Sequence, residues 1–242
     1  MKRFFVWLAL YLVISIVAIN IGINLGISDH GAAIIPLGCL SIALLIYVQR
    51  FGVDKQIGLG VAPAVPVARM WFYLPLLALV VFPLSRGLRG DLTVFLVIMI
   101  VLHYLFVGFL EEVLFRGFLL QALLKETRPL WAILVTAVTF GLGHVTSLLI
   151  GQGGADTLRQ ILNAIVVGLI FTLVVFVTGN LHAVIVAHIL YNICAVLSPD
   201  TVGISTLIFG IVVLLIYGSW LLFGVGGREK LKNSQRPIPA YF

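Results

Sequence analysis

Three apolar stretches of the sequence each contain a short polar motif. The motifs are Glu111-Glu112-x-x-x-Arg116, Phe140-x-x-x-His144 and His188-x-x-x-Asn192. A charged side chain at the centre of a bilayer costs about 2.5–3.5 kcal/mol on insertion scales, so such residues are usually paired, turned inward and functional. We therefore interpret the three motifs as parts of one site.

These residue types favour hydrolysis by an activated water. The four-residue spacing puts Glu112 and Arg116 on one helical face, where they can pair. Glu111 points about 100° away from Glu112 and has no partner on its own helix. A Glu beside a His can take the proton of a water while the His orients it. The N–H groups of His188 and Asn192 could stabilise an oxyanion.

A zinc ion carrying the water is an alternative use of the same residues. Its ligands would be Glu111, His144 and His188. The two histidines lie on different predicted helices, and using Glu111 as a ligand removes the best general base. Glu112 is better used on Arg116, because an unpaired buried guanidinium is costly. We therefore favour a site with no metal and no other cofactor.

The elements that must position the motifs are membrane helices. Of the 242 residues, 62% are hydrophobic and 10% are charged, and the mean hydropathy is +1.20, which excludes an ordinary soluble domain. Eight spans are predicted, over 4–25, 32–50, 70–85, 92–123, 130–150, 159–178, 181–198 and 203–224. The predicted fold is an all-α, polytopic bundle that forms one integral membrane domain over 1–242, with its catalytic core in 92–198.

Positive charges predict the orientation of the bundle. One side holds eleven of them: Lys2, Arg3, Arg50, Lys55, Arg69, Lys125, Arg128, Arg228, Lys230, Lys232 and Arg236. The other side holds three: Arg86, Arg89 and Arg159. The positive-inside rule places both termini in the cytoplasm, and we expect a site open to that side. The net charge of +6 belongs to the membrane surface and does not indicate nucleic acid as a partner.

In order and spacing, the motifs resemble the CPBP intramembrane protease family over residues 104–198. That family includes the CAAX prenyl endopeptidases and the bacterial bacteriocin self-immunity (Abi) proteins. It is called a metalloprotease family, although a glutamate-activated water without metal is its best-argued mechanism. His182 departs from the family pattern, because many members carry an aromatic residue near the start of that helix.

The resemblance implies a role for each motif residue. Glu111 would be the general base, and His144 would help to position the water. Glu112 and Arg116 would be a supporting pair. His188 and Asn192 would form the oxyanion-stabilising site, and we interpret Phe140 as a packing residue beside it.

Three other histidines are given structural roles. We expect His103 to make a helix–helix hydrogen bond, because it lies nearly opposite Glu112 on the predicted fourth helix. His182 lies near the cytoplasmic boundary, where hydration explains it. His30 is expected in an outer loop.

The predicted function is endopeptidase cleavage of a CAAX-like prenylated peptide, or of a bacterial peptide or membrane protein. The predicted partners are this substrate and the lipid bilayer, in the plasma membrane if the host is prokaryotic. One alternative is a non-proteolytic scaffold or bacteriocin-immunity protein that binds a membrane partner. A transporter or proton relay is a second alternative, although the sequence shows no inverted repeat. The sequence does not predict an oligomeric state.

Overall fold

The structure is a computed structural model of the chain, and it describes residues 1–61, 71–199 and 204–224. Helices make up nearly all of this part, and no strand is present in it. The α-helices are α1 (Lys2–Asn24), α2 (Asp29–Arg50), α3 (Leu74–Val81), α4 (Val94–Glu112), α5 (Leu120–Glu126), α6 (Pro129–Gly143), α7 (Gly154–Thr178), α8 (His182–Leu197), α9 (Ile204–Val213) and α10 (Ser219–Phe223). Two π-helical segments (Val113–Leu119 and Leu214–Gly218) and two 3-10 segments (Phe82–Arg86 and His144–Ile150) extend them.

Helices lie at all eight places where spans were predicted. Six are long and apolar enough to cross a membrane: Lys2–Asn24, His30–Arg50, Val94–Glu126, Pro129–Ile150, Gly154–Thr178 and Ile204–Phe223. Two shorter apolar helices, Trp71–Arg86 and His182–Leu197, correspond to the third and seventh predicted spans. The all-α, polytopic fold is thus confirmed and the chain is an integral membrane protein, while the count of eight spans stays a prediction.

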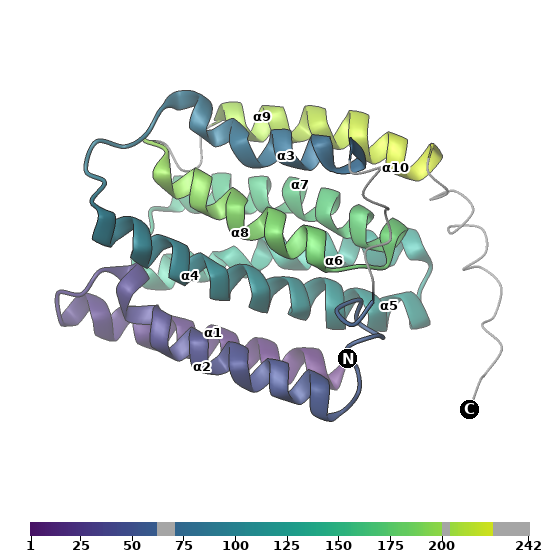
Figure 1. The fold of residues 1–242 in the computed structure, drawn as a ribbon, viewed down its shortest axis with the longest axis horizontal. Helices are drawn as coiled ribbons and strands as arrows, with labels where there is room; N and C mark the ends of the chain where they lie inside the picture. The colour runs from purple at the N-terminus through teal and green to yellow at the C-terminus, as the bar shows by residue number, and fades with distance from the viewer. Residues whose placement is uncertain (62–70, 200–203, 225–242) are drawn as a thin grey trace.

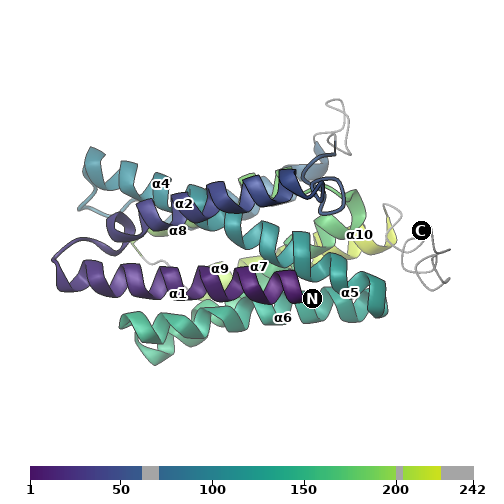
Figure 2. The same ribbon diagram turned by 90° about the horizontal axis from the view of Figure 1, so that it is seen from below.

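The helices pack roughly parallel to one another along the long axis of the molecule (Figures 1 and 2). Helices α1 and α2 form a hairpin against α4, and α6 and α7 form a second hairpin. Helix α8 packs on α4, while α3 and α9 cover the far side of α7 and α8. Helices α4, α7 and α8 therefore form the centre of the bundle, and two of the three motifs lie on α4 and α8.

Glycines allow the closest helix contacts near the motifs. A Cβ built on Gly108 of α4 would lie 3.1 Å from the backbone nitrogen of Ile189 in α8. A Cβ on Gly141 of α6 would lie 2.9 Å from the carbonyl oxygen of Ile161 in α7. Neither position has room for a side chain, so glycine brings these helix pairs together.

The regular helices change their winding at the motifs. Helix α4 ends at Glu112 and continues as the π-helical segment Val113–Leu119, which contains Arg116. Helix α6 ends at Gly143, and His144 begins the 3-10 segment. Local π and 3-10 turns change the direction in which side chains point, and they are frequent at functional sites.

Candidate active site

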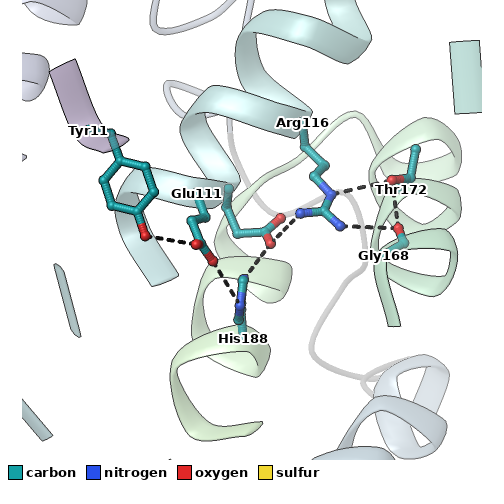
Figure 3. A network of polar contacts seen from close by, with 7 residues as sticks. Tyr11, Glu111, Arg116, Gly168, Thr172 and His188 are labelled. Atoms are coloured by element: carbon teal, nitrogen blue, oxygen red, sulfur yellow. Dashed lines mark hydrogen bonds and ion pairs between the residues drawn. The ribbon is translucent and has the colours of Figure 1, made fainter. Parts of the chain in front are cut away.

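The predicted pair of Glu112 and Arg116 is present and fully enclosed. Nη1 of Arg116 donates to Oε1 of Glu112 at 2.8 Å, and both side chains are 0% exposed (Figure 3 shows the network around Arg116). Nε donates to the hydroxyl of Thr172 at 3.3 Å, and Nη2 donates to the carbonyl of Gly168 at 3.1 Å. The guanidinium carbon lies 4.4 Å from the ring centre of Phe140. Helix α7 therefore provides acceptors for two nitrogens that Glu112 does not contact.

A glycine on α7 makes this arrangement possible. A Cβ on Gly168 would lie 3.0 Å from Cδ1 of Phe140 and 3.3 Å from Nη2 of Arg116. The packing role predicted for Phe140 is consistent with its burial and with its contact to the guanidinium. Gly168 and Thr172 were not predicted from the sequence, because neither belongs to a motif.

His188 lies between the two glutamates. Its Nδ1 is 2.6 Å from Oε1 of Glu112, and its Nε2 is 3.4 Å from Oε2 of Glu111 (Figure 3). Both ring nitrogens thus face carboxylates. The ring of His188 is thus oriented by Glu111 and Glu112. Its role as an oxyanion donor together with Asn192 stays a prediction.

Glu111 differs from Glu112 in lining the cavity described below, whereas Glu112 is fully enclosed. The Tyr11 hydroxyl donates to Oε1 of Glu111 at 2.8 Å, from a residue 100 positions away in the chain. Oε2 has no hydrogen-bond partner in the described part of the chain. Glu111 is only 8% exposed, so its carboxylate sits in a restricted space. Tyr11 was not predicted from the sequence, because an aromatic residue in an apolar first span gives no signal of its own.

The remaining motif residues surround one cavity of about 240 Å³. Its wall includes Glu111, His144, His188 and Asn192, together with Phe140. Helices α1, α4, α6, α7 and α8 all contribute to the wall. The structure thus brings the carboxylate, both imidazoles and the amide together around one space. A carboxylate and imidazoles in such a space can bind a water and take its proton.

The cavity lies on one side of Glu111, away from the N-terminus. Its wall takes residues of α1 from Leu8 to Ile19, residues of α4 from His103 to Glu111, and residues of α8 from His188 to Val196. These segments run from the level of the carboxylates toward the end of the bundle that holds the α1–α2 turn (Figure 1). That the site opens to the cytoplasmic side stays a prediction. Sequence motifs give the depth of a residue but not the side from which it is reached.

Polar side chains also line the outer part of the cavity. Asn163 donates to the Tyr191 hydroxyl at 2.7 Å, and the Ser147 hydroxyl donates to Oε1 of Gln160 at 3.0 Å. All four residues belong to the wall. Sequence reasoning did not select them, because isolated hydroxyls and amides on apolar helices are common.

His103 and His30 lie together, and the prediction for His30 was wrong. His30 belongs to α2, which begins at Asp29, so it is not in a loop. The ring centres of His30 and His103 are 5.1 Å apart, so His103 does make a contact between α4 and α2. His182 begins α8, and the side chain of Asn180 accepts a hydrogen bond from its backbone nitrogen at 2.8 Å.

The described residues do not fit a metal site. Among them, no group of three or more His, Cys, Asp or Glu side chains is arranged to hold a metal ion. The zinc ligands considered from the sequence were Glu111, His144 and His188, but both nitrogens of His188 face the glutamates.

Comparison with known proteins gives one family. Residues 93–194 match a family model described as type II CAAX prenyl endopeptidase, Rce1-like. Neither the curated proteins nor the solved structures contain a match. The matched residues include all three motifs and the helices from α4 to α8 that carry them. The match over residues 93–194 supports the CPBP/CAAX protease family, which the three motifs had indicated.

Proposed function

We propose that the chain is an intramembrane endopeptidase that hydrolyses a peptide bond with a water activated by Glu111. The observation that carries this proposal is the state of the Glu111 carboxylate. Tyr11 holds one oxygen, whereas the other has no hydrogen bond among the described residues, lies 3.4 Å from Nε2 of His188 and belongs to a residue of the cavity wall. A buried carboxylate in this state can accept a proton from a water.

In the proposed reaction, Glu111 passes one proton from the water to the leaving amine. Glu111 takes a proton from the water, and the resulting hydroxide attacks the carbonyl carbon of the peptide. The tetrahedral oxyanion is stabilised by N–H donors on the cavity wall, for which we propose Asn192 and His144. As the C–N bond breaks, Glu111 returns the proton to the leaving amine. The oxyanion collapses to the carbonyl, so that one water and one peptide bond give a carboxylic acid and an amine, which then ionise to a carboxylate and an ammonium group.

Glu112 and Arg116 act through His188 in this scheme. Oε1 of Glu112 is contacted by both Arg116 and Nδ1 of His188, so the ion pair fixes the ring. The ring in turn holds Nε2 beside Glu111. The three residues are positioning residues, and Glu111 is the group that reacts.

For the substrate we propose a short peptide segment at the membrane, in the plasma membrane of a prokaryotic host. The family description names a prenylated CAAX peptide, so a CAAX-like prenylated peptide is one candidate. A bacterial peptide or an exposed segment of a membrane protein is the other. Both place a peptide bond in the same cavity, and they differ in the presence of a lipid chain.

The experiment uses the purified chain in detergent, where both faces of the bundle are accessible. A farnesylated CAAX peptide, its unprenylated form and a mixed peptide library are incubated with the chain, and products are identified by mass spectrometry. The expected result is cleavage that disappears in Glu111→Gln. Cleavage of none of the three substrates, or cleavage that survives Glu111→Gln, would overturn the proposal.

A further inference from the structure

One face of helix α7 brings two amide side chains to the cavity. The residues of α7 that belong to the wall follow the spacing i, i+3, i+4 and i+7: Gln160, Asn163, Ala164 and Val167. This spacing places the four side chains on one side of a helix. Polar side chains inside membrane segments are expensive, and they usually serve a function. Neither amide has a role in the hydrolysis proposed above.

The Asn163 amide is joined to the residue that precedes Asn192 in the chain. Its Nδ2 donates to the Tyr191 hydroxyl at 2.7 Å, which links α7 to α8. Tyr191 is buried, Asn163 is half-buried, and both belong to the cavity wall. Oδ1 of Asn163 is buried and has no hydrogen-bond partner in the part of the chain that the structure describes. A buried polar atom in this state costs free energy until a partner binds to it.

Asn163 and Tyr191 together offer one acceptor and one donor at the same place. A hydroxyl has a hydrogen to donate as well as lone pairs, so Tyr191 can donate while it accepts from Asn163. The count is the same if the oxygen and nitrogen of the amide exchange places. Oδ1 then accepts from Tyr191, Nδ2 keeps its hydrogens and the hydroxyl oxygen becomes the acceptor. Both arrangements therefore complement a ligand that has one donor and one acceptor side by side.

A residue in an extended peptide is such a ligand. Its N–H and C=O point to the same side of the chain, as they do in the hydrogen-bonded pairs of antiparallel strands. An acceptor and a donor on the wall can therefore bind both groups of one residue. These contacts involve backbone atoms only, so they do not depend on the side chain of the bound residue.

The pair lies close to the proposed general base. Nε2 of His188 is 3.4 Å from Oε2 of Glu111, and Tyr191 follows His188 by three residues on α8. Three residues of a helix rise by about 4.5 Å, whereas one residue of an extended chain spans about 3.3 Å. A peptide with its cleaved bond at Glu111 would therefore reach the pair within one or two residues.

We propose that Asn163 and Tyr191 form a subsite that binds the backbone N–H and C=O of one substrate residue, one or two positions from the cleaved bond. The subsite holds the substrate in an extended conformation and accepts many side chains at that position. This inference rests on the proposed peptidase function. Asn163 and Tyr191 bind the substrate and take no part in the transfer of the proton.

The first measurement is of kcat and KM for the peptide that the purified chain cleaves fastest, either the farnesylated CAAX peptide or a member of the library. Tyr191→Phe removes the hydroxyl and keeps the ring, and Asn163→Leu replaces the amide with an apolar group of similar size. Each should raise KM by about 3–10-fold, the usual effect of one lost hydrogen bond. The value of kcat should change little, because the same contact is made in the ground state and the transition state.

Two further variants separate binding from folding. Asn163→Leu combined with Tyr191→Phe removes both polar groups, so neither is left buried without the other. Tyr217→Phe is the matched control, because its hydroxyl donates a buried bond to the Phe72 carbonyl at 3.0 Å and lies outside the cavity wall. We expect the combined variant to raise KM and the control to leave it unchanged, with unfolding temperatures measured for both.

The second measurement identifies the backbone group that is bound. Analogues of the cleaved peptide carry a methyl group on one backbone nitrogen at a time, near the cleaved bond, which removes one N–H donor from each. At one position, methylation should raise the KM of the parent protein about 3–10-fold more than that of the combined variant, which has already lost the contact. Replacing the side chain at that position should change KM by less than about threefold.

The results separate the subsite from the peptidase function. An unchanged KM in Tyr191→Phe and in Asn163→Leu, or equal effects of methylation on the parent and the combined variant at every position, would overturn the subsite alone. A lower unfolding temperature with an unchanged KM would make the pair a structural contact between α7 and α8. If the chain cleaves no peptide, the peptidase function falls and the subsite falls with it.

Discussion

Glu111 and Glu112 are neighbours in the chain, yet they lie in two different regions of the molecule. Glu112 is 0% exposed, and its Oε1 is held by both Arg116 and His188. Glu111 borders the cavity, and Tyr11 is its one hydrogen-bond donor among the described residues. Two carboxylates can take different roles when their surroundings differ in this way. From this difference we propose that Glu111 is the reacting group and that Glu112 stabilises the structure.

The largest effect should come from removing the base while keeping its shape. Glu111→Gln is expected to lower the cleavage rate by about 10²–10⁴-fold, the usual contribution of a general base. Its thermal unfolding temperature should stay close to that of the parent protein, because the amide still accepts a hydrogen bond from Tyr11. Initial rates and unfolding curves in detergent check both parts. If Glu111→Gln loses its fold together with its activity, Glu111 is needed for stability as Glu112 is, which would contradict the proposed difference between them.

Glu112→Ala should show the reverse pattern. Removing one partner of a buried ion pair leaves the other charge unpaired and costs about 3–5 kcal/mol. We expect a clear fall in unfolding temperature and in the yield of monodisperse protein, measured by size-exclusion chromatography. Glu112→Ala combined with Arg116→Met should recover part of that stability, since no unpaired charge remains. A well-expressed Glu112→Ala protein of ordinary stability would contradict the structural role.

Tyr11→Phe should have an intermediate effect on the rate. A hydrogen bond to a charged group contributes about 1.5–3 kcal/mol, so losing it should slow cleavage by about 10–100-fold. Tyr217→Phe is the matched control, because that hydroxyl also donates a buried bond, at 3.0 Å to the Phe72 carbonyl, but outside the cavity wall. Equal rates for the two variants would show that Tyr11 does not hold Glu111 for the reaction.

His103→Gln should change the rate least among the substitutions in the wall. His103 lies at the part of the cavity away from the carboxylates and contacts His30 on α2. We expect less than about a threefold change, because surroundings without a contact to the reacting group contribute little to the barrier. A fall in the cleavage rate as large as that of Glu111→Gln would show that residues well outside the motifs take part in the reaction.

A chelator should leave the rate unchanged if Glu111 activates the water alone. A zinc site would need deprotonated ligands that are free to coordinate, and both nitrogens of His188 face carboxylates. Elemental analysis of the purified, active protein is the measurement. One tightly held zinc per chain, whose removal abolishes cleavage and whose return restores it, would replace the glutamate-only chemistry.

The sequence determined the features that depend on local spacing. Apolar stretches of about 20 residues indicated where helices would form, and the structure has helices at each of those places. The four-residue spacing predicted the pair of Glu112 and Arg116, because residues i and i+4 share one helical face. The three motifs indicated the family in the same way, since their order is a property of the chain itself.

Only the tertiary structure decided how the helices face one another. Tyr11 meets Glu111 across 100 residues, and His188 turns both of its nitrogens toward the glutamates. Each contact depends on the rotation of a helix about its axis and on its depth in the bundle. Apolar helices that are hydrophobic on all faces carry no periodic signal for either quantity. The close approach of α4 and α8 was likewise set by packing, through glycines such as Gly108 that leave no room for a side chain.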